Sequence, residues 1–176
     1  MMKILFFLTL ICSSVGMAQA EISSSEKSKY IRTTESLTLE AAFVLQKQAT
    51  EKAALLGKSI SVAILDASGN ILLLTRGAGV GPHNTEAARR KAFTALSTQT
   101  PTLMLLRNAA KNPDTQNLNS LPELLLLSGG IPVCNRSQII GSIGIAGGGS
   151  PENDHAIAQS VQIPEEGIST RNTNIQ

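Results

Sequence analysis

The sequence predicts a mixed α/β (α+β) domain in which helices pack against a largely antiparallel sheet. Two observations carry this prediction. Apolar residues recur at helical spacing in several separate segments, whereas other segments combine apolar runs with the turn residues typical of hairpins. These segments follow one another in the order helix, two strands, helix, up to three strands, helix. Because the strand connections are tight, they favour antiparallel neighbours with helices packed on them.

The first helix is predicted to begin at Leu39, where the preceding Thr38 supplies a side-chain oxygen for the N-cap. Its helical repeat ends before Gly57, a natural stop, and comprises Ala42, Leu45, Ala49, Ala53 and Leu56. Residues 59–76 then form two β-rich runs around a turn at 66–70 that contains Gly and Asn. This pattern predicts a β-hairpin.

A second helix is predicted after the glycine-rich loop 77–82, with Asn84 or Thr85 as its N-cap. One narrow face carries mostly small side chains, namely Ala88, Ala92, Ala95 and Leu96. Small side chains let a helix approach a sheet closely, so this face is expected to lie on the sheet. Pro101 ends the helix, a shorter helix follows at about 103–110, and the polar residues 111–121 predict a surface loop.

The last third of the chain predicts further strands and one helix. Residues 124–127 are apolar, and the Gly and Pro residues at 129–132 indicate a turn. The segment QIIGSIGIAGGG (138–149) predicts a strand whose glycines allow close backbone approach. Pro151 and Asn153 open a final helix that extends to Val161.

The N-terminus has the pattern of a secretory signal peptide. Lys3 precedes an apolar run, and Ala18-Gln19-Ala20 fits a cleavage site. The run is too short to span a bilayer, so we expect no membrane span after cleavage. The predicted organisation is therefore a signal peptide (1–20), a flexible arm (21–37), a folded domain (38–162) and a flexible tail (163–176). The protein is expected to be exported and to be periplasmic or secreted.

Composition argues against nucleic acid as a partner. The chain has fifteen Lys and Arg against thirteen Asp and Glu, a formal net charge of +2, and cleavage would also remove Lys3. Beyond residue 20 the aromatic residues are only Tyr30, Phe43 and Phe93, too few for a base-stacking platform. Cleavage would leave Cys134 as the single cysteine, so no internal disulfide is expected.

Five segments of the chain resemble the GlcG/HbpS-like haem-binding family, whose domain also occurs fused to corrinoid adenosyltransferases. The segments are VAILDASGNIL (62–72), ARRKAFTAL (88–96), GGIPV (129–133), IIGSIGIAG (139–147) and NDHAIA (153–158). They occur in the family's order over residues 38–160. The resemblance implies a profilin-like α-β-α domain with a five-stranded antiparallel sheet and a tendency to form homo-oligomers. It also implies binding of haem or a related tetrapyrrole in some members, with haem degradation proposed for a few.

His83 is the main candidate for a ligand of iron. A neutral imidazole is a common axial ligand of haem, and the nearby helix N-terminus, where Asn84 lies, offers N–H groups to a propionate. The alternative is that His83 only turns or caps the chain. Lys91 and Thr94 lie near the alanine-rich face, where Lys91 either meets a ligand carboxylate or forms a surface salt bridge.

Gly129, Gly130 and Pro132 either shape the rim of a pocket or form a tight turn that closes a hairpin. His155 is expected to be exposed and not a ligand, and Met104 is expected to lie in the core. Three further residues are expected to have no binding role. Cys134, which follows GGIPV, has one cationic neighbour and is expected to be at most modestly reactive, and the pair Arg89–Arg90 is expected to be solvated.

The sequence favours an exported small-molecule-binding protein with haem as its ligand. No nucleophile elbow, catalytic triad, converging carboxylate pair or phosphate-binding loop is present, so binding is favoured over catalysis. The two histidines are far apart in the sequence and do not predict a zinc site. Two alternatives stay open. One is an accessory protein or enzyme of small hydroxy-acid (glycolate-like) metabolism, and the other is a non-catalytic oligomeric module for sensing or interaction.

Overall fold

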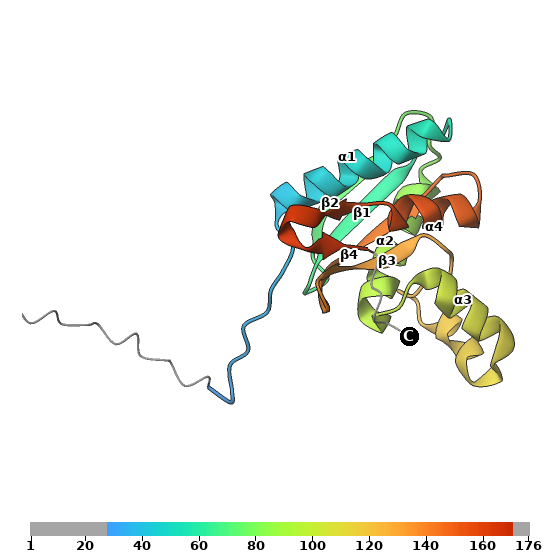
Figure 1. Cartoon of the computed structure of the whole chain (residues 1–176). Helices are drawn as coiled ribbons and strands as arrows, with labels where there is room; N and C mark the ends of the chain where they lie inside the picture. Colours follow the sequence, from blue (N-terminus) through green and yellow to red (C-terminus); the bar gives the residue numbers. More distant parts are fainter. Residues whose placement is uncertain (1–27, 171–176) are drawn as a thin grey trace, which may run out of the picture. The chain divides into compact units, whose positions relative to one another are not determined.

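An antiparallel sheet with helices on both faces forms the centre of the domain in this computed structural model (Figure 1). The structure describes residues 28–170, of which residues 33–170 belong to one compact unit and residues 28–32 to a separate N-terminal unit. Within the described residues, the sheet has six strands in the order β2-β1-β4-β3-β6-β5. Their bounds are β1 (Ser61–Asp66), β2 (Ile71–Arg76), β3 (Gly130–Asn135), β4 (Gln138–Ala146), β5 (Gln162–Ile163) and β6 (Ile168–Ser169).

The helices form the two outer layers. They are α1 (Leu39–Leu55), α2 (His83–Thr98), α3 (Thr102–Lys111) and α4 (Pro151–Gln159), with short 3₁₀ helices η1 (Pro113–Ser120) and η2 (Pro164–Glu166). The main core joins α1, α4 and one face of the sheet, whereas α2 packs on the opposite face. The predicted α-β-α arrangement is therefore confirmed, with one strand more than expected.

Helix α1 forms as its sequence predicts. Thr38 Oγ1 accepts a hydrogen bond from the backbone N–H of Ala41 at 3.2 Å, which caps the helix. The predicted apolar face is buried up to Ala53, whereas Leu56 at its end is 40% exposed. The hairpin of β1 and β2 is also as predicted, because Asp66 Oδ1 accepts from the N–H groups of Ser68 and Asn70 in its turn.

At one point the backbone of helix α2 lies directly against the backbone of the sheet, with no side chain between them. A Cβ built on Gly144 of β4 would overlap the carbonyl of Ala88 and lie 2.7 Å from the backbone nitrogen of Ala92. The small residues of α2 thus lie against a glycine, as the alanine-rich face predicts. The predicted cap is wrong, however. Pro82 precedes the helix in helical geometry without a side-chain capping bond, so α2 begins at His83.

The segment between α2 and β3 differs from the prediction in two places. The expected surface loop is the 3₁₀ helix η1, and the apolar residues 124–127 form no strand. Leu124 and Leu126 instead pack with Ala109 in a small separate core. Met104 of α3, expected in the core, is 40% exposed.

The expected flexible tail is folded as far as the structure describes it. Strand β6 pairs with β3 through Cys134 and Ser169, and the buried Thr170 donates a hydrogen bond to the carbonyl of Val161 at 3.0 Å. The end of the expected arm is also fixed, because the buried Leu37 donates its N–H to Ile140 O at 2.9 Å. The predicted signal peptide, residues 21–27 of the arm and the last residues (171–176) lie outside the described residues. No helix within residues 28–170 has the length and apolarity needed to cross a membrane.

Candidate functional site

A cleft of about 390 Å³ lies where α2 and α4 begin. Its volume is within the usual range for small-molecule sites. Ala87, Leu106 and Leu127 supply apolar wall, and the remaining lining is mostly polar. Three predicted site residues meet here, namely His83, Asn84 and Lys91.

His83 is the first residue of α2, and its side chain is exposed at the cleft. The imidazole lies against Gly81. A Cβ at Gly81 would be 2.8 Å from Cε1 of His83 and 3.0 Å from its Nδ1. The absence of a side chain at Gly81 therefore leaves the space that the ring occupies, and the ring keeps access to the cleft.

Lys91 lies at the bottom of the cleft in a buried ion pair. Its ammonium is 2.7 Å from Oδ2 of Asp154 in α4 and donates a second hydrogen bond to Ile145 O at 2.9 Å. The two side chains are only 5% and 10% exposed. Both sequence-based alternatives for Lys91 thus need correction. The salt bridge is buried, and the carboxylate that meets the lysine is the protein's own.

Asp154 is the functional residue that the sequence analysis missed. Its second oxygen, Oδ1, accepts the N–H of Gly148 at 2.7 Å, so one carboxylate joins the lysine to the loop before α4. The sequence carries only an indirect signal for this pairing. A lysine on a buried helix face requires an acidic partner, but nothing local indicates which of the chain's carboxylates it meets.

Gly129 and Gly130 form neither the rim of the cleft nor a hairpin turn. Gly129 has φ +116°, and a Cβ there would lie 2.6 Å from Ile145 O and 2.8 Å from the Cβ of Asp154. Gly130 lies against the backbone of Lys91 and donates its N–H to Thr102 Oγ1 at 2.9 Å. Both glycines therefore permit the close packing that surrounds the ion pair.

Thr94 and Pro132 also lie away from the lining of the cleft. The buried Thr94 donates to Arg90 O at 2.7 Å and accepts the N–H of Leu125 at 2.8 Å, which fixes the segment before β3. Pro132 is buried in β3 opposite Ser142 of β4. These two residues support the scaffold.

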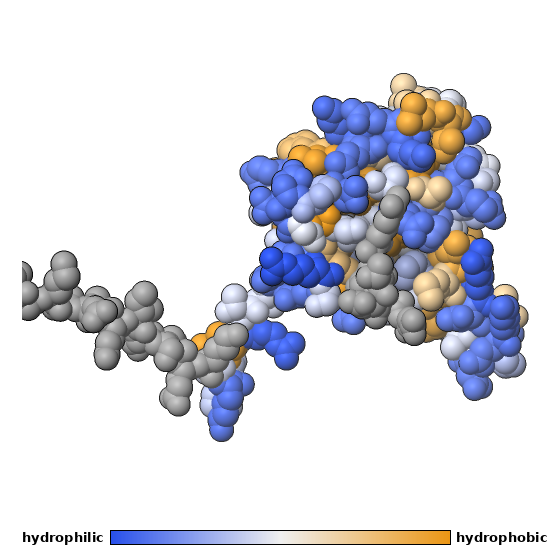
Figure 2. Space-filling view, in the orientation of Figure 1, coloured by the Kyte–Doolittle hydropathy of each residue, from blue (hydrophilic) through white to orange (hydrophobic). Residues whose placement is uncertain are grey.

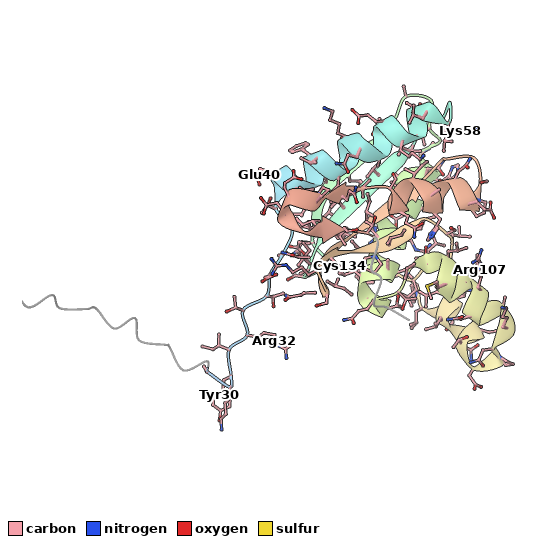
Figure 3. The ribbon with its side chains drawn as sticks, in the orientation of Figure 1. Tyr30, Arg32, Glu40, Lys58, Arg107 and Cys134 are labelled. Atoms are coloured by element: carbon pink, nitrogen blue, oxygen red, sulfur yellow. The ribbon has the colours of Figure 1, made fainter. Side chains whose placement is uncertain are left out.

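The α4 side of the cleft is formed by the loop 147–150. Ser150 caps α4 by accepting the N–H of Asn153 at 3.1 Å. Lys58, in the loop after α1 (Figure 3), places its ammonium 3.1 Å from where a Cβ of Gly149 would be. Helix N-termini carry partial positive charge. Because two of them border this cleft and the ammonium of Lys58 lies close to Gly149 of its lining, the polar side of the cleft suits an anionic group.

His155 is outside the cleft lining and is half-buried, where the sequence predicted exposure. Its Nδ1 has no hydrogen-bond partner among residues 28–170. Burial, and secondly the charge of Arg107 in α3, lowers the pKa of His155 below its ordinary value. Arg89 and Arg90 are also not simply solvated. Arg89 contacts Glu86 at 2.7 Å, and Arg90 donates to the carbonyl of Leu124 at 2.6 Å.

No group of three or more His, Cys, Asp and Glu side chains arranged to hold a metal ion occurs in the described part of the chain. Any iron in the cleft would therefore require a ligand system of its own, such as a porphyrin, together with a single protein ligand.

Comparisons with known proteins place the chain beside haem-related proteins. The family model for haem-degrading proteins similar to HbpS matches residues 37–162. The crystal structure of HbpS is 39% identical with a TM-score of 0.69, over 75% of this chain and 92% of that chain. The PduOC:heme complex is 28% identical with a TM-score of 0.64, over 71% of this chain and 91% of that chain. A search of curated proteins gave no match.

A further solved structure supports the fold alone. The protein ORFY of Klebsiella pneumoniae is 24% identical with a TM-score of 0.71, over 75% of this chain and 92% of that chain.

Proposed function

Because this chain belongs to the HbpS-like family, we propose that it binds haem or a related tetrapyrrole in the cleft between the N-termini of α2 and α4. The observation that carries the proposal is the position of His83, whose imidazole lies at the opening of a cleft with apolar walls. The solved complex of PduOC with haem, which has the same fold, adds support.

The residues of the cleft fit such a group. Ala87, Leu106 and Leu127 offer an apolar surface for the face of a macrocycle, and His83 offers one nitrogen ligand for its iron. The partial positive charge at the N-terminus of α4 and the ammonium of Lys58 beside Gly149 would attract propionate groups. A larger cleft elsewhere in the domain contains no His, Cys, Met, Tyr or Lys in its lining, so it offers no such ligand.

Bound haem would supply an iron centre able to bind further small ligands or exchange electrons. The protein's own part is to hold it. Lys91 and Asp154 fix the floor of the cleft, and Gly81 leaves room for the His83 ring. Each of these residues shapes the cleft and none is assigned a chemical step, as expected for a binding protein.

A second candidate ligand is a small hydroxy acid. Two helix N-termini border the cleft, and the ammonium of Lys58 lies close to Gly149 of its lining. These features suit a carboxylate whether or not a porphyrin carries it. Thermal unfolding of the protein with glycolate and, separately, with hemin distinguishes the two candidates. If glycolate protects the protein against heat and hemin does not, the hydroxy acid is the ligand.

Export completes the proposal. The N-terminal segment 1–20 has the order of a signal peptide, and the mature chain would begin at Glu21. Intact mass measurement of protein from its own host tests this directly. A chain that retains Met1 and fractionates with the cytoplasm would contradict export.

The test of haem binding is a hemin titration followed in the visible spectrum. His83→Ala should shift the Soret band and weaken binding about tenfold or more, a change of about 1.4 kcal/mol in binding free energy. His155→Ala is the matched control, because this second histidine lies outside the lining of the cleft and should leave both spectrum and affinity unchanged. Hemin binding that is identical in both variants and the parent would show that His83 is not the ligand.

A further inference from the structure

A second cleft, of about 540 Å³, lies on the α1 side of the domain. It is formed by segments far apart in the sequence, namely residues 35–44, part of the β3–β4 hairpin, and the β5–η2–β6 segment. Its apolar lining includes the side chains of Leu37, Ile140, Ile163 and Ile168, with the exposed Val44 on one wall. The haem proposal makes no use of this cleft.

Hydrogen bonds hold the walls of the cleft in place. The N–H of Leu37 donates to Ile140 O at 2.9 Å, and Ser36 Oγ accepts the N–H of Ala67 at 3.0 Å. On the other side, the Gln48 side chain makes two 2.8 Å hydrogen bonds to the backbone of Gln162. A cleft whose walls are tied together in this way is formed before a ligand arrives, which lowers the entropy lost on binding.

The charged side chains that line the cleft are all acidic, namely Glu35 before α1, Glu40 in the first turn of α1 and Glu166 in η2, and among the described residues no lysine or arginine lines it. A cation does lie beside this lining, because Arg136 follows Asn135 and its Nε is 3.9 Å from where a Cβ of Gly167 would be. Figure 3 shows Glu40 at the N-terminal end of α1. Hydrogen bonds from its own backbone and from Thr38 lower the pKa of Glu40, so its carboxylate stays ionised near neutral pH.

The three carboxylates do not form a metal site, since no metal-holding group of acidic residues occurs within residues 28–170. Spread around an apolar interior, they complement an organic cation better than a compact metal ion. We propose that this cleft is a second binding site, for a small molecule that combines an apolar body with a protonated amine.

The proposal is tested with a pair of fluorescent probes of opposite charge. Dansylcadaverine carries an apolar fluorophore and a protonated amine, and dansylglycine carries the same fluorophore with a carboxylate. Dansylcadaverine should bind the full-length mature protein with a rise in emission, and dansylglycine should bind much more weakly. Because exposed ion pairs are individually weak, Glu40→Gln/Glu166→Gln should weaken dansylcadaverine binding by about fivefold.

Two controls locate the probe. Glu51→Gln/Asp114→Asn removes two carboxylates outside the cleft and should leave binding unchanged, whereas Val44→Lys should weaken it by placing a cation on the exposed wall. Saturation with hemin and His83→Ala should both leave dansylcadaverine binding unchanged, so this test is independent of the haem proposal. Equal binding of the two probes, or no effect of Glu40→Gln/Glu166→Gln, would overturn the inference.

Discussion

The ammonium of Lys91 and the carboxylate of Asp154 meet at 2.7 Å beneath the candidate haem cleft, although 63 positions separate them in the sequence. The contact joins α2 to α4, and the hydrogen bond from Lys91 to Ile145 O adds β4. Because α2 and α4 pack on opposite faces of the sheet, this pair links the two helical layers at the edge where the cleft opens.

Removing one member of this pair should destabilise the domain strongly. Asp154→Ala leaves a buried ammonium without its partner and also removes the acceptor of the Gly148 N–H, so a loss of about 3–5 kcal/mol is expected. Urea unfolding measures the loss. The double variant Lys91→Met/Asp154→Leu should recover much of it, since no charge is then buried. If both variants are equally unstable, packing rather than charge pairing explains the effect.

The contact between α2 and β4 leaves no room for a larger side chain. Ala92 is fully buried, and its backbone lies against Gly144. Ala92→Leu should therefore destabilise the domain by about 1–3 kcal/mol because the added atoms must displace the helix. The exposed Ala54→Leu of α1 is the control and should change the unfolding midpoint little. An unchanged midpoint for Ala92→Leu would mean that α2 tolerates displacement from the sheet.

Features determined by neighbouring residues were predictable from the sequence. The Thr38 cap, the apolar face of α1 and the Asp66 turn depend on residues within a few positions of one another. The close approach of α2 to the sheet followed from its small residues. The predicted start of α2 is too late, because Pro82 adopts helical geometry and the helix begins at His83 without a polar side-chain cap.

Other errors concern contacts between distant segments. Strands β5 and β6 have two residues each, too few for a periodic pattern, and β6 is defined by its pairing with β3. The partner of Lys91 could not be chosen from local sequence for the same reason. Of the candidate site, His83, Asn84 and Lys91 come together in the cleft. Thr94, predicted from its place near the alanine-rich face, and Gly129, Gly130 and Pro132, predicted as a pocket rim or a turn, serve the scaffold instead.

His155 should make stability depend on pH. Burial and then Arg107 lower its pKa in the folded state, so below about pH 6.5 the unfolded chain takes up this proton more readily than the folded one. The free energy of unfolding should consequently fall as the pH drops through this range. Chemical denaturation at a series of pH values measures this. The free energy of unfolding should fall less steeply in His155→Gln than in the parent, and Arg107→Gln should lie between the two. Parallel curves for all three proteins would contradict this assignment.

The purified protein is expected to be a homo-oligomer, as the family resemblance implies. Exposed apolar residues support this, including Phe43 of α1, 55% exposed, and Ile71 of the edge strand β2, 48% exposed. Figure 2 also shows apolar side chains at the C-terminal end of α1, where Leu55 is exposed. Light scattering should give a mass above that of one chain, and Phe43→Glu/Ile71→Glu should lower it. A single-chain mass across micromolar concentrations would end this expectation.

The last prediction concerns Gly81 and His83, and it depends on the proposed haem site. A Cβ at Gly81 would lie 2.8 Å from Cε1 of His83, so Gly81→Ala must push the imidazole out of its present position. Because His83 is exposed, its ring can move without disturbing the core, and stability should change little. The Hε1 resonance of His83 should shift in the protein without hemin. Hemin binding should weaken, though less than in His83→Ala, since the displaced ring can still return at the expense of strain.

Gly79→Ala in the same loop separates backbone strain from contact with the ring. Gly79 has φ +76° and nothing within 4 Å of a Cβ, so alanine there strains the backbone by about 1 kcal/mol without touching His83. That variant should be slightly less stable but bind hemin as the parent does. If Gly79→Ala weakens hemin binding as much as Gly81→Ala, the conformation of the loop, and not the placement of the imidazole, controls the site. If Gly81→Ala shifts the Hε1 resonance but leaves hemin binding intact, the ring moves as the structure requires and the iron has another ligand.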